Sequence, residues 1–345
     1  MHSELSNEAS KFLNEQLKTH PYELTNDDKH VLKTRGLAEF IFSRITRSKF
    51  RRTSLDSDTV ADIKFKIKYQ ILNNDPISFS VPFGAYKNWH LSSFPEPDWG
   101  EVFNINYMLR FLAPISAVYE PGAKLQYSYS DNVMDIVSNI PKEYTKRYIT
   151  VFDKLLSLFQ QSASKNIILK SIKINDFYAE GEQFLEMNNN YEDNRKNWFK
   201  KYPENVRLKK LASAKHNLML NGIQDLSTLD GEQLEARFLQ SAMWCDALDS
   251  LQWRRKFNKG STNIQIVYVK GPYLSLHLGA CETSVGQAWA MTGVLEKRGL
   301  RLLQTIVSHA TLKSFEVAKN IQLINVDTLF RELSNNYLAI PFRDI

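Results

Sequence analysis

Residues 77–90 read ISFSVPFGAYKNWH and residues 97–101 read PDWGE, and these two stretches decide the fold. The first six residues alternate apolar and small polar side chains, which predicts a short strand that ends at Pro82. A helical pattern over 100–119 and a second strand over 123–130 follow, and that strand also ends in polar residues. In an open α/β sheet the carboxyl ends of the strands line the crevice where ligands bind. This edge is therefore the expected place of a functional site.

The alternation of strands and helices continues beyond this stretch. A helical pattern over 142–161 precedes an apolar strand over 166–174, and a β-α-β-α-β order predicts a parallel sheet with crossover helices. Four later strand-like runs predict an antiparallel extension, and they span 262–269, 273–278, 286–296 and 300–308. The expected fold class is α/β, with a Rossmann-like, mostly parallel sheet, a helical N-terminal segment and an antiparallel C-terminal extension.

These patterns divide the 345 residues into four segments, which together are long enough for one large domain. We expect a helical N-terminal segment over 1–55, a Rossmann-like α/β core over 56–180, a helical insertion over 181–259 and a β-rich part over 260–345 that completes the same domain. Residues 59–72 fit the spacing of a helix and of a strand, and the turn signal that follows them favours a helix.

The composition is that of an ordinary globular protein, with 43% hydrophobic and 24% charged residues. The sequence has no run of about 18 apolar residues and no apolar signal core near its start, so we expect neither a membrane span nor a secretory signal. Two cysteines, Cys245 and Cys281, are too few for a disulfide framework or a four-cysteine zinc site. We expect a cytoplasmic protein with no metal and no cofactor.

The net charge of +6 favours anionic partners. Basic residues crowd residues 44–52 and residues 254–259, and each cluster reads either as a solvated surface or as a phosphate site. Arg254 and Arg255, next to Trp253, are candidate phosphate contacts because a guanidinium binds phosphate with two parallel hydrogen bonds. Aromatic residues do not alternate with these charges in an RNA-binding motif, which argues against nucleic acid.

Lys87 lies in the loop that follows the first strand. It reads either as a surface lysine or as a functional one, which would hold a phosphate or carboxylate, or form a Schiff base if burial lowered its pKa. Gly84 allows a ligand to approach the backbone closely. The other candidate substrate contacts of this loop are Phe83, Asn88 and His90.

Asp98 and Glu101 flank Gly100 at the start of the predicted helix. Asp98 can cap that helix and Glu101 suits its dipole, but two carboxylates at this spacing also suit a general base or a clamp on an amine. Ser130 and Asp131 follow the second strand, where they read as ligand contacts or as a turn.

The order and spacing of these elements resemble the dityrosine/pyoverdine biosynthesis family, which includes the isocyanide (isonitrile) synthases. The resemblance covers residues 75–160, about a quarter of the chain, and it rests on a series of short motifs. In sequence order these are Pro76-Ile77, Val81-Pro82-Phe83, Lys87, Pro97-Asp98-Trp99-Gly100-Glu101, Val118-Tyr119-Glu120-Pro121-Gly122-Ala123 and Ser130-Asp131.

The resemblance implies an enzyme of secondary metabolism that converts the amine of an amino acid to an isonitrile, with a carbon from ribulose 5-phosphate. Lys87 would then contact the phosphate or the carbonyl. Asp98, Glu101 and Asp131 would hold the amine or move protons. An iron-dependent oxygenase is the implied pathway partner.

The sequence departs from the family pattern at several points. The family loop usually reads F-P-x-K-S-P-N, whereas residues 83–88 read FGAYKN and place the lysine one position later. Asn132 stands where a glycine usually follows Ser-Asp. Two alternatives therefore stay open, namely a binding protein for a phosphorylated metabolite and a basic protein associated with nucleic acid.

Overall fold

The computed structural model describes most of the chain. The described ranges are 2–18, 21–84, 86–87, 96–130, 134–220, 226–251, 262–268, 274–283, 286–333 and 337–345. Five of the predicted site residues, Asn88, His90, Asp131, Arg254 and Arg255, lie outside these ranges.

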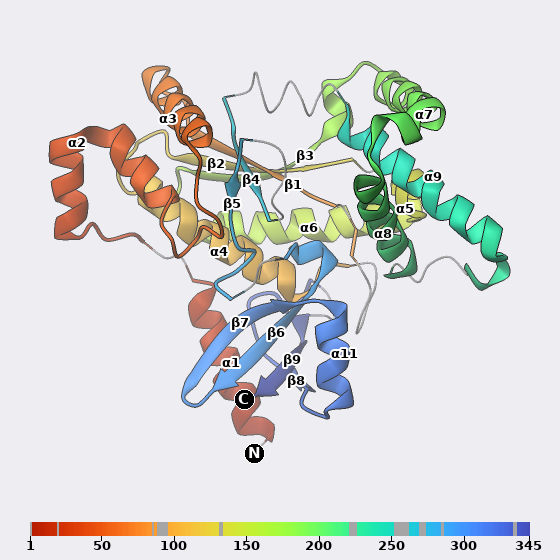
Figure 1. The fold of residues 1–345 in the computed structure, drawn as a ribbon. Coiled ribbons are helices and arrows are strands. Elements are labelled where there is room, and N and C mark those ends of the chain that lie inside the picture. Colours follow the sequence, from red (N-terminus) through yellow and green to blue (C-terminus); the bar gives the residue numbers. More distant parts are fainter. Residues whose placement is uncertain are drawn as a thin grey trace.

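Five parallel strands form the central sheet, in the order β3-β2-β1-β4-β5 (Figure 1). Their bounds are Ile77–Pro82 for β1, Ala123–Tyr129 for β2, Ile167–Lys173 for β3, Ile264–Val267 for β4 and Leu276–His277 for β5. This order is that of a Rossmann sheet, in which the chain direction across the sheet reverses between β1 and β4. The predicted fold class is confirmed.

The C-terminal part differs from its expected arrangement. Its first two strands, β4 and β5, join the central sheet in parallel, and the antiparallel pairing belongs to a separate sheet with the order β7-β6-β9-β8. Within this second sheet β6 and β9 pair in parallel. Its strands are β6 (Thr292–Arg298), β7 (Arg301–Val307), β8 (Gln322–Asn325) and β9 (Ala339–Asp344).

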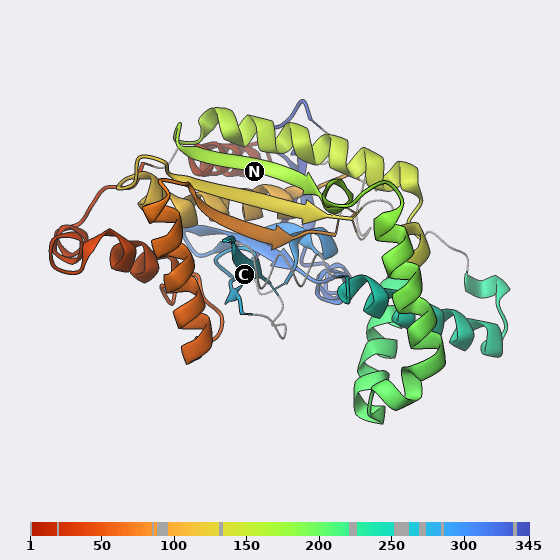
Figure 2. The same ribbon diagram turned by 90° about the horizontal axis from the view of Figure 1, so that it is seen from above.

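Helices surround the two sheets. α2 and α3 lie at one end of the central sheet, and α7, α8 and α9 project from the other end (Figures 1 and 2). The segment 59–72 is helical, as predicted, and lies within α3. The longer helices are α1 (His2–Gln16), α2 (Asn26–Ile45), α3 (Ser57–Leu72), α4 (Trp99–Ser116), α6 (Lys142–Ser162), α7 (Glu182–Lys201), α8 (Glu204–Leu220) and α9 (Gly231–Asp249). The shorter ones are α5 (Met134–Ser138) and α11 (His309–Val317). No described helix is both long and apolar enough to span a bilayer.

Helix α4 lies between the two sheets (Figure 1), which places it at the centre of the molecule. It begins at Asp98, whose side chain accepts a hydrogen bond from the Gly100 amide, while the Asp98 amide donates to the Glu101 carboxylate. Apolar side chains cover all its sides, as expected for a helix buried between layers. Glu101, Asn104 and Asn106 are also buried on this helix, so each requires a polar partner.

The tight turn before β2 provides a first prediction. Gly122 has a φ of +70°, and a Cβ there would overlap with the backbone oxygen of Asn166. That oxygen is held by the Ala123 amide at 3.0 Å, so it cannot move aside easily. Gly122→Ala is expected to lower the free energy of unfolding by about 2–4 kcal/mol, because it adds backbone strain and overpacks the turn. Urea denaturation measures this loss.

Gly181 offers the matched control because its φ is +76° and a Cβ there would meet no atom within 4 Å. Gly181→Ala carries the backbone strain alone and is expected to cost about 1–2 kcal/mol. Equal losses in the two variants would contradict a role for the contact with Asn166.

Candidate functional site

The carboxyl ends of β1, β2 and β4 meet at one edge of the central sheet, at the reversal point of the strand order. β1 leads into Phe83 and Gly84, β2 leads into Ser130, and β4 leads into Tyr268. The predicted site residues of the first two strands thus follow neighbouring strand ends. Such an edge is the usual ligand site of an open α/β sheet.

Aromatic side chains pack densely at this edge. The Phe83 ring lies 4.3 Å from the Phe152 ring and 5.3 Å from the Trp289 ring, measured between centroids. Tyr268 faces the same indole at 5.9 Å. Trp289 therefore connects the end of β1 to the end of β4 across the reversal point.

Gly84 lies against the Trp289 indole, and a Cβ on Gly84 would overlap with the indole ring. The space that Gly84 leaves open beside the backbone is filled here by the Trp289 side chain. Gly84→Ala is expected to displace the indole and to lower the free energy of unfolding by about 1–3 kcal/mol, measured together with a shift in tryptophan fluorescence.

Gly231, at the start of α9 and in open space, is the control for this substitution. Gly231→Ala is expected to leave both the fluorescence and the stability nearly unchanged. An unaltered fluorescence spectrum in Gly84→Ala would contradict the predicted displacement of Trp289.

Lys87, Asp98 and Glu101 form one buried charged cluster beside this aromatic group. The Lys87 Nζ lies 2.9 Å from Asp98 Oδ1, 2.9 Å from Glu101 Oε2 and 3.0 Å from Glu101 Oε1. It also donates to the backbone oxygen of Ala288 at 2.8 Å. Three protein groups therefore take up the three N–H donors of the ammonium. A phosphate that contacts Lys87 would have to displace one of them.

Electrostatics in this cluster favour a charged lysine. Burial lowers the pKa of Lys87, but the charges of Asp98 and Glu101 outweigh this effect, and the net pKa is raised above its ordinary value of 10.5. A Schiff base requires a neutral amine at working pH. The Schiff-base alternative for Lys87 is therefore not favoured, because the neighbouring carboxylates stabilise the ammonium.

Glu101 differs from an ordinary surface carboxylate. Burial raises its pKa, Lys87 lowers it and Asp98 raises it again, with a net result of about 7. The Tyr148 hydroxyl donates to Glu101 Oε1 at 2.7 Å, and burial raises the pKa of Tyr148 well above its ordinary value of 10.0. A carboxyl group with a pKa near 7 can both accept and return a proton at neutral pH.

A neutral polar network lies one turn further along α4. The Asn104 amide nitrogen donates to the Tyr268 hydroxyl at 2.9 Å and to the Ala280 backbone oxygen at 2.8 Å. Its amide oxygen accepts from the Tyr127 hydroxyl at 3.1 Å. Asn104 thus joins the ends of β2 and β4 to the helix that carries Glu101.

The remaining predicted contact within the described ranges is Ser130. It is buried, and its Oγ accepts a 3.4 Å hydrogen bond from the Gln183 amide of α7. The sequence predicted no site role for Tyr148, Tyr268 or Trp289, which come from distant parts of the chain. Among the described residues no group of three His, Cys, Asp or Glu side chains could hold a metal ion.

Comparisons with known proteins find a similar sequence and a similar structure that bear on this chain. No protein-family model matches the chain. The L-tryptophan isonitrile synthase AmbI2 of Fischerella ambigua is 23% identical over 257 residues, which are 70% of this chain and 74% of AmbI2. The crystal structure of PvcA from Pseudomonas aeruginosa superposes with a TM-score of 0.63 at 13% identity, and the match covers 88% of this chain and 99% of PvcA.

The sequence match and the structural match agree with each other. The first covers most of both chains, and the second shows that the two-sheet architecture is shared almost throughout PvcA. Both relatives correspond to the resemblance stated from the sequence. The chain is a distant homologue of the isonitrile synthase AmbI2 and has the fold of PvcA, and its predicted relation to the isocyanide synthases is thereby confirmed.

Proposed function

We propose that this protein is a biosynthetic enzyme of the isonitrile synthase type, which joins the amine of an amino acid to the carbonyl carbon of ribulose 5-phosphate. The observation that carries the proposal is the homology to AmbI2 over 257 residues. The position of the Lys87 cluster beside the strand ends supports it, because a group able to transfer protons lies where such folds bind substrates.

The first step of this chemistry needs proton transfer. One ammonium and one ketone give one imine, one water molecule and one proton. The nitrogen attacks only after it has lost its proton, and the carbonyl oxygen must be protonated before it leaves as water. Glu101, with a pKa of about 7, is the described group best suited to accept and return these protons.

Lys87 and Tyr148 then act as positioning residues. Both contact Glu101 Oε1, at 3.0 Å and 2.7 Å, and they fix the orientation of the carboxyl group. Asp98 holds the opposite side of the ammonium at 2.9 Å. Asp131 as a second acid, and Arg254 and Arg255 as phosphate contacts, remain proposals from the sequence.

Product analysis tests the proposal. The full-length protein is incubated with ribulose 5-phosphate, isotopically labelled at its carbonyl carbon, and with each amino acid in turn. Mass spectrometry is expected to detect one amino acid in which NC replaces NH2 and carries the label. The control reaction contains unlabelled ribose 5-phosphate, an aldehyde isomer with the same phosphate.

Two results would contradict the proposal. Binding of ribulose 5-phosphate without any labelled product would instead indicate a binding protein for a phosphorylated metabolite. Absence of both binding and product with every amino acid would remove the substrate assignment altogether.

A further inference from the structure

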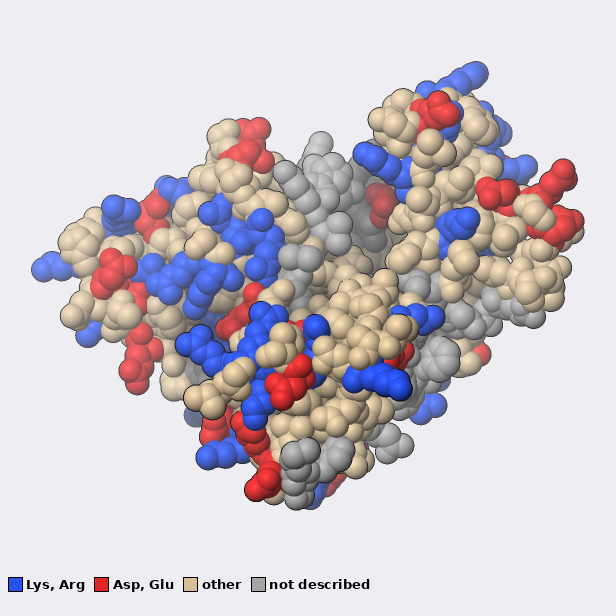
Figure 3. All heavy atoms as spheres, turned by 60° about the horizontal axis from the view of Figure 1, so that its bottom comes forward, with Lys and Arg blue, Asp and Glu red and all other residues tan. Residues whose placement is uncertain are grey.

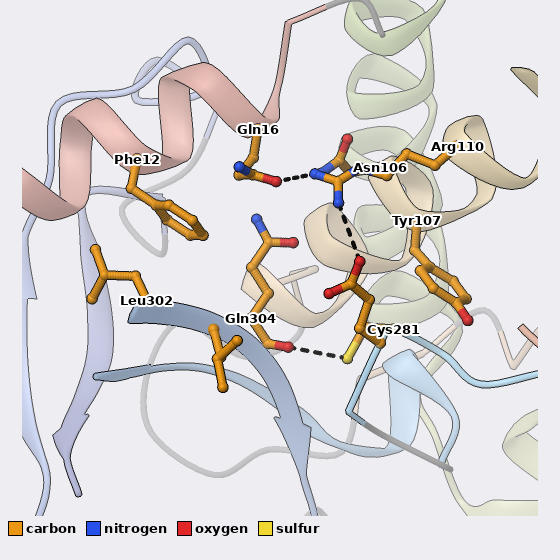
Figure 4. A pocket seen from close by; sticks show the side chains of 10 residues that line it. Phe12, Gln16, Asn106, Tyr107, Arg110, Cys281, Leu302 and Gln304 are labelled. Carbon is orange, nitrogen blue, oxygen red and sulfur yellow. Dashed lines mark hydrogen bonds and ion pairs between the residues drawn. The ribbon is translucent and has the colours of Figure 1, made fainter. Parts of the chain in front are cut away.

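A cavity of about 190 Å³ lies between α1, α4 and β7 (Figure 4), and its lining includes no residue of the Lys87 cluster. Its polar lining includes Asn106 and Arg110 of α4, Gln16 of α1 and Gln304 of β7. Cys281 and Glu282, which follow β5, close another side. Apolar side chains complete the wall, and they are Phe12, Leu302 and Leu303.

This cavity contains two amide donors that have no acceptor among the described residues. They are the Asn106 Nδ2 and the Gln304 Nε2, and both atoms are buried. Asn106 as a whole is 2% exposed. A buried donor without an acceptor costs about 1–3 kcal/mol, so these two groups are suited to a ligand that brings acceptors.

One cation, Arg110, lies on the wall of the same cavity. The Arg110 guanidinium hydrogen-bonds to Gln16 Oε1 and lies 3.4 Å from Glu282 Oε1 (Figure 4). Arg52 donates to the backbone oxygens of Cys281 and Glu282, and Lys49 lies close enough to interact electrostatically with Arg110 and Glu282. Arg110 and Glu282 line the cavity, whereas Arg52 and Lys49 lie behind this wall. Figure 3 shows Lys and Arg side chains on both halves of this face, with Asp and Glu side chains among them.

Helix geometry separates this cavity from the Lys87 cluster. Asn106 follows Glu101 by five residues, which corresponds to about 140° around the helix axis and a rise of roughly 7.5 Å. Glu101 faces Lys87 and Tyr148, whereas Asn106 lines the cavity together with Gln304 of the second sheet. The two sites therefore lie on different sides of α4.

We propose that this cavity is a second ligand site, specific for a small organic carboxylate whose short apolar part packs on Phe12 and Leu302. The carboxylate accepts hydrogen bonds from Asn106 and Gln304 and is attracted by Arg110. The volume suits such a ligand, because a cavity of about 150 Å³ holds benzene. The inference does not depend on the proposed isonitrile chemistry.

Calorimetric titration with benzoate tests the assignment, because benzoate joins a carboxylate to a ring of suitable size. Wild-type protein is expected to bind benzoate at least about tenfold more tightly than benzamide, its uncharged analogue, and more tightly than inorganic phosphate. Gln304→Glu and Asn106→Asp replace a donor by a negative acceptor of the same shape. Each is expected to weaken benzoate binding by about tenfold or more.

The controls separate ligand binding from folding and from catalysis. Gln322→Glu makes the same change on the exposed strand β8 of the same sheet, outside the cavity, and is expected to bind benzoate like the wild type. Gln304 is only partly buried in β7, so Gln304→Glu should disturb the fold less than Asn106→Asp. It therefore serves as the test if Asn106→Asp is unstable. Thermal melting confirms that each variant is folded.

Three outcomes would overturn the proposal. The first is no benzoate binding by folded wild-type protein, and the second is binding that Gln304→Glu leaves unchanged. The third is stronger binding of benzamide or phosphate than of benzoate. Benzoate binding that persists in Glu101→Gln would support a separate site, even in a protein that forms no isonitrile.

Discussion

Lys87→Met is expected to lower the free energy of unfolding by about 3–5 kcal/mol at neutral pH, because it leaves buried carboxylates without the cation they share. The Lys87 side chain is 4% exposed, and those of Glu101 and Asp98 are 1% and 16% exposed. Methionine has a similar length, so the loss reports the missing charge more than a missing volume. Urea denaturation of the full-length protein measures it.

The pH dependence of this loss distinguishes charge from packing. Without Lys87 the pKa of Glu101 rises further, because the lysine charge is the largest effect that lowers it. A carboxyl group with a raised pKa stabilises the fold at low pH, where it is neutral, and loses this contribution as pH increases through its folded pKa. Below neutral pH Glu101 is protonated in both folded proteins, so the Lys87→Met defect should grow as pH increases above about 7 and shrink as pH falls back toward 7.

Two further variants complete this test. In Lys87→Met/Glu101→Gln one of the unpaired charges is gone, so the double variant is expected to recover a large part of the lost stability. Lys64→Met removes the partner of Glu39 at 2.8 Å, but both side chains are about one-third exposed, and a loss below about 1 kcal/mol is expected. A defect in Lys87→Met that is small and independent of pH would contradict the buried charge cluster.

The first three strands of the central sheet could be predicted because their signals are local. β1 and β2 are short apolar runs that end at turns, and the helix between them begins at a capping pair formed by Asp98 and Glu101. The last part of the chain was harder to predict. β9 contains Pro341 and pairs in parallel with β6, more than forty residues earlier, and only tertiary packing reveals such pairing.

The site could be predicted only in part, for a similar reason. Lys87, Asp98 and Glu101 lie within fifteen residues of one another, so the sequence could suggest that they cooperate. Tyr148 reaches Glu101 from α6, and the Ala288 oxygen reaches Lys87 from residues that precede β6. Neither contact leaves a motif in the sequence, because each depends on how distant elements pack. From the sequence, helix capping and a functional role were alternative interpretations of Asp98 and Glu101. In the structure the same two carboxylates cap α4 and also contact Lys87.

Glu101→Gln is expected to reduce isonitrile formation by about 10²–10⁴-fold, the usual contribution of a general acid or base. Glutamine keeps the shape and can still accept a hydrogen bond from Lys87 or Tyr148, but it cannot take up a proton. In the wild type the rate at limiting substrate should increase with pH through about 7, as Glu101 loses its proton. Glu101→Gln should lack this rise, and a pH profile of kcat/KM with both proteins measures it.

Glu101→Gln is also expected to change how stability depends on pH, and this effect can be measured whether or not the protein is active. The pKa of Glu101 increases from 4.5 in the unfolded chain to about 7 in the fold, so the folded state binds more protons between these values. Wild-type stability relative to Glu101→Gln should therefore be greatest below pH 4.5 and decrease by up to ~1.4 kcal/mol per pH unit as pH increases toward 7. Parallel stability curves for wild type and Glu101→Gln would refute the raised pKa, and a pH-rate profile shared by the two proteins would refute the role of Glu101 in proton transfer.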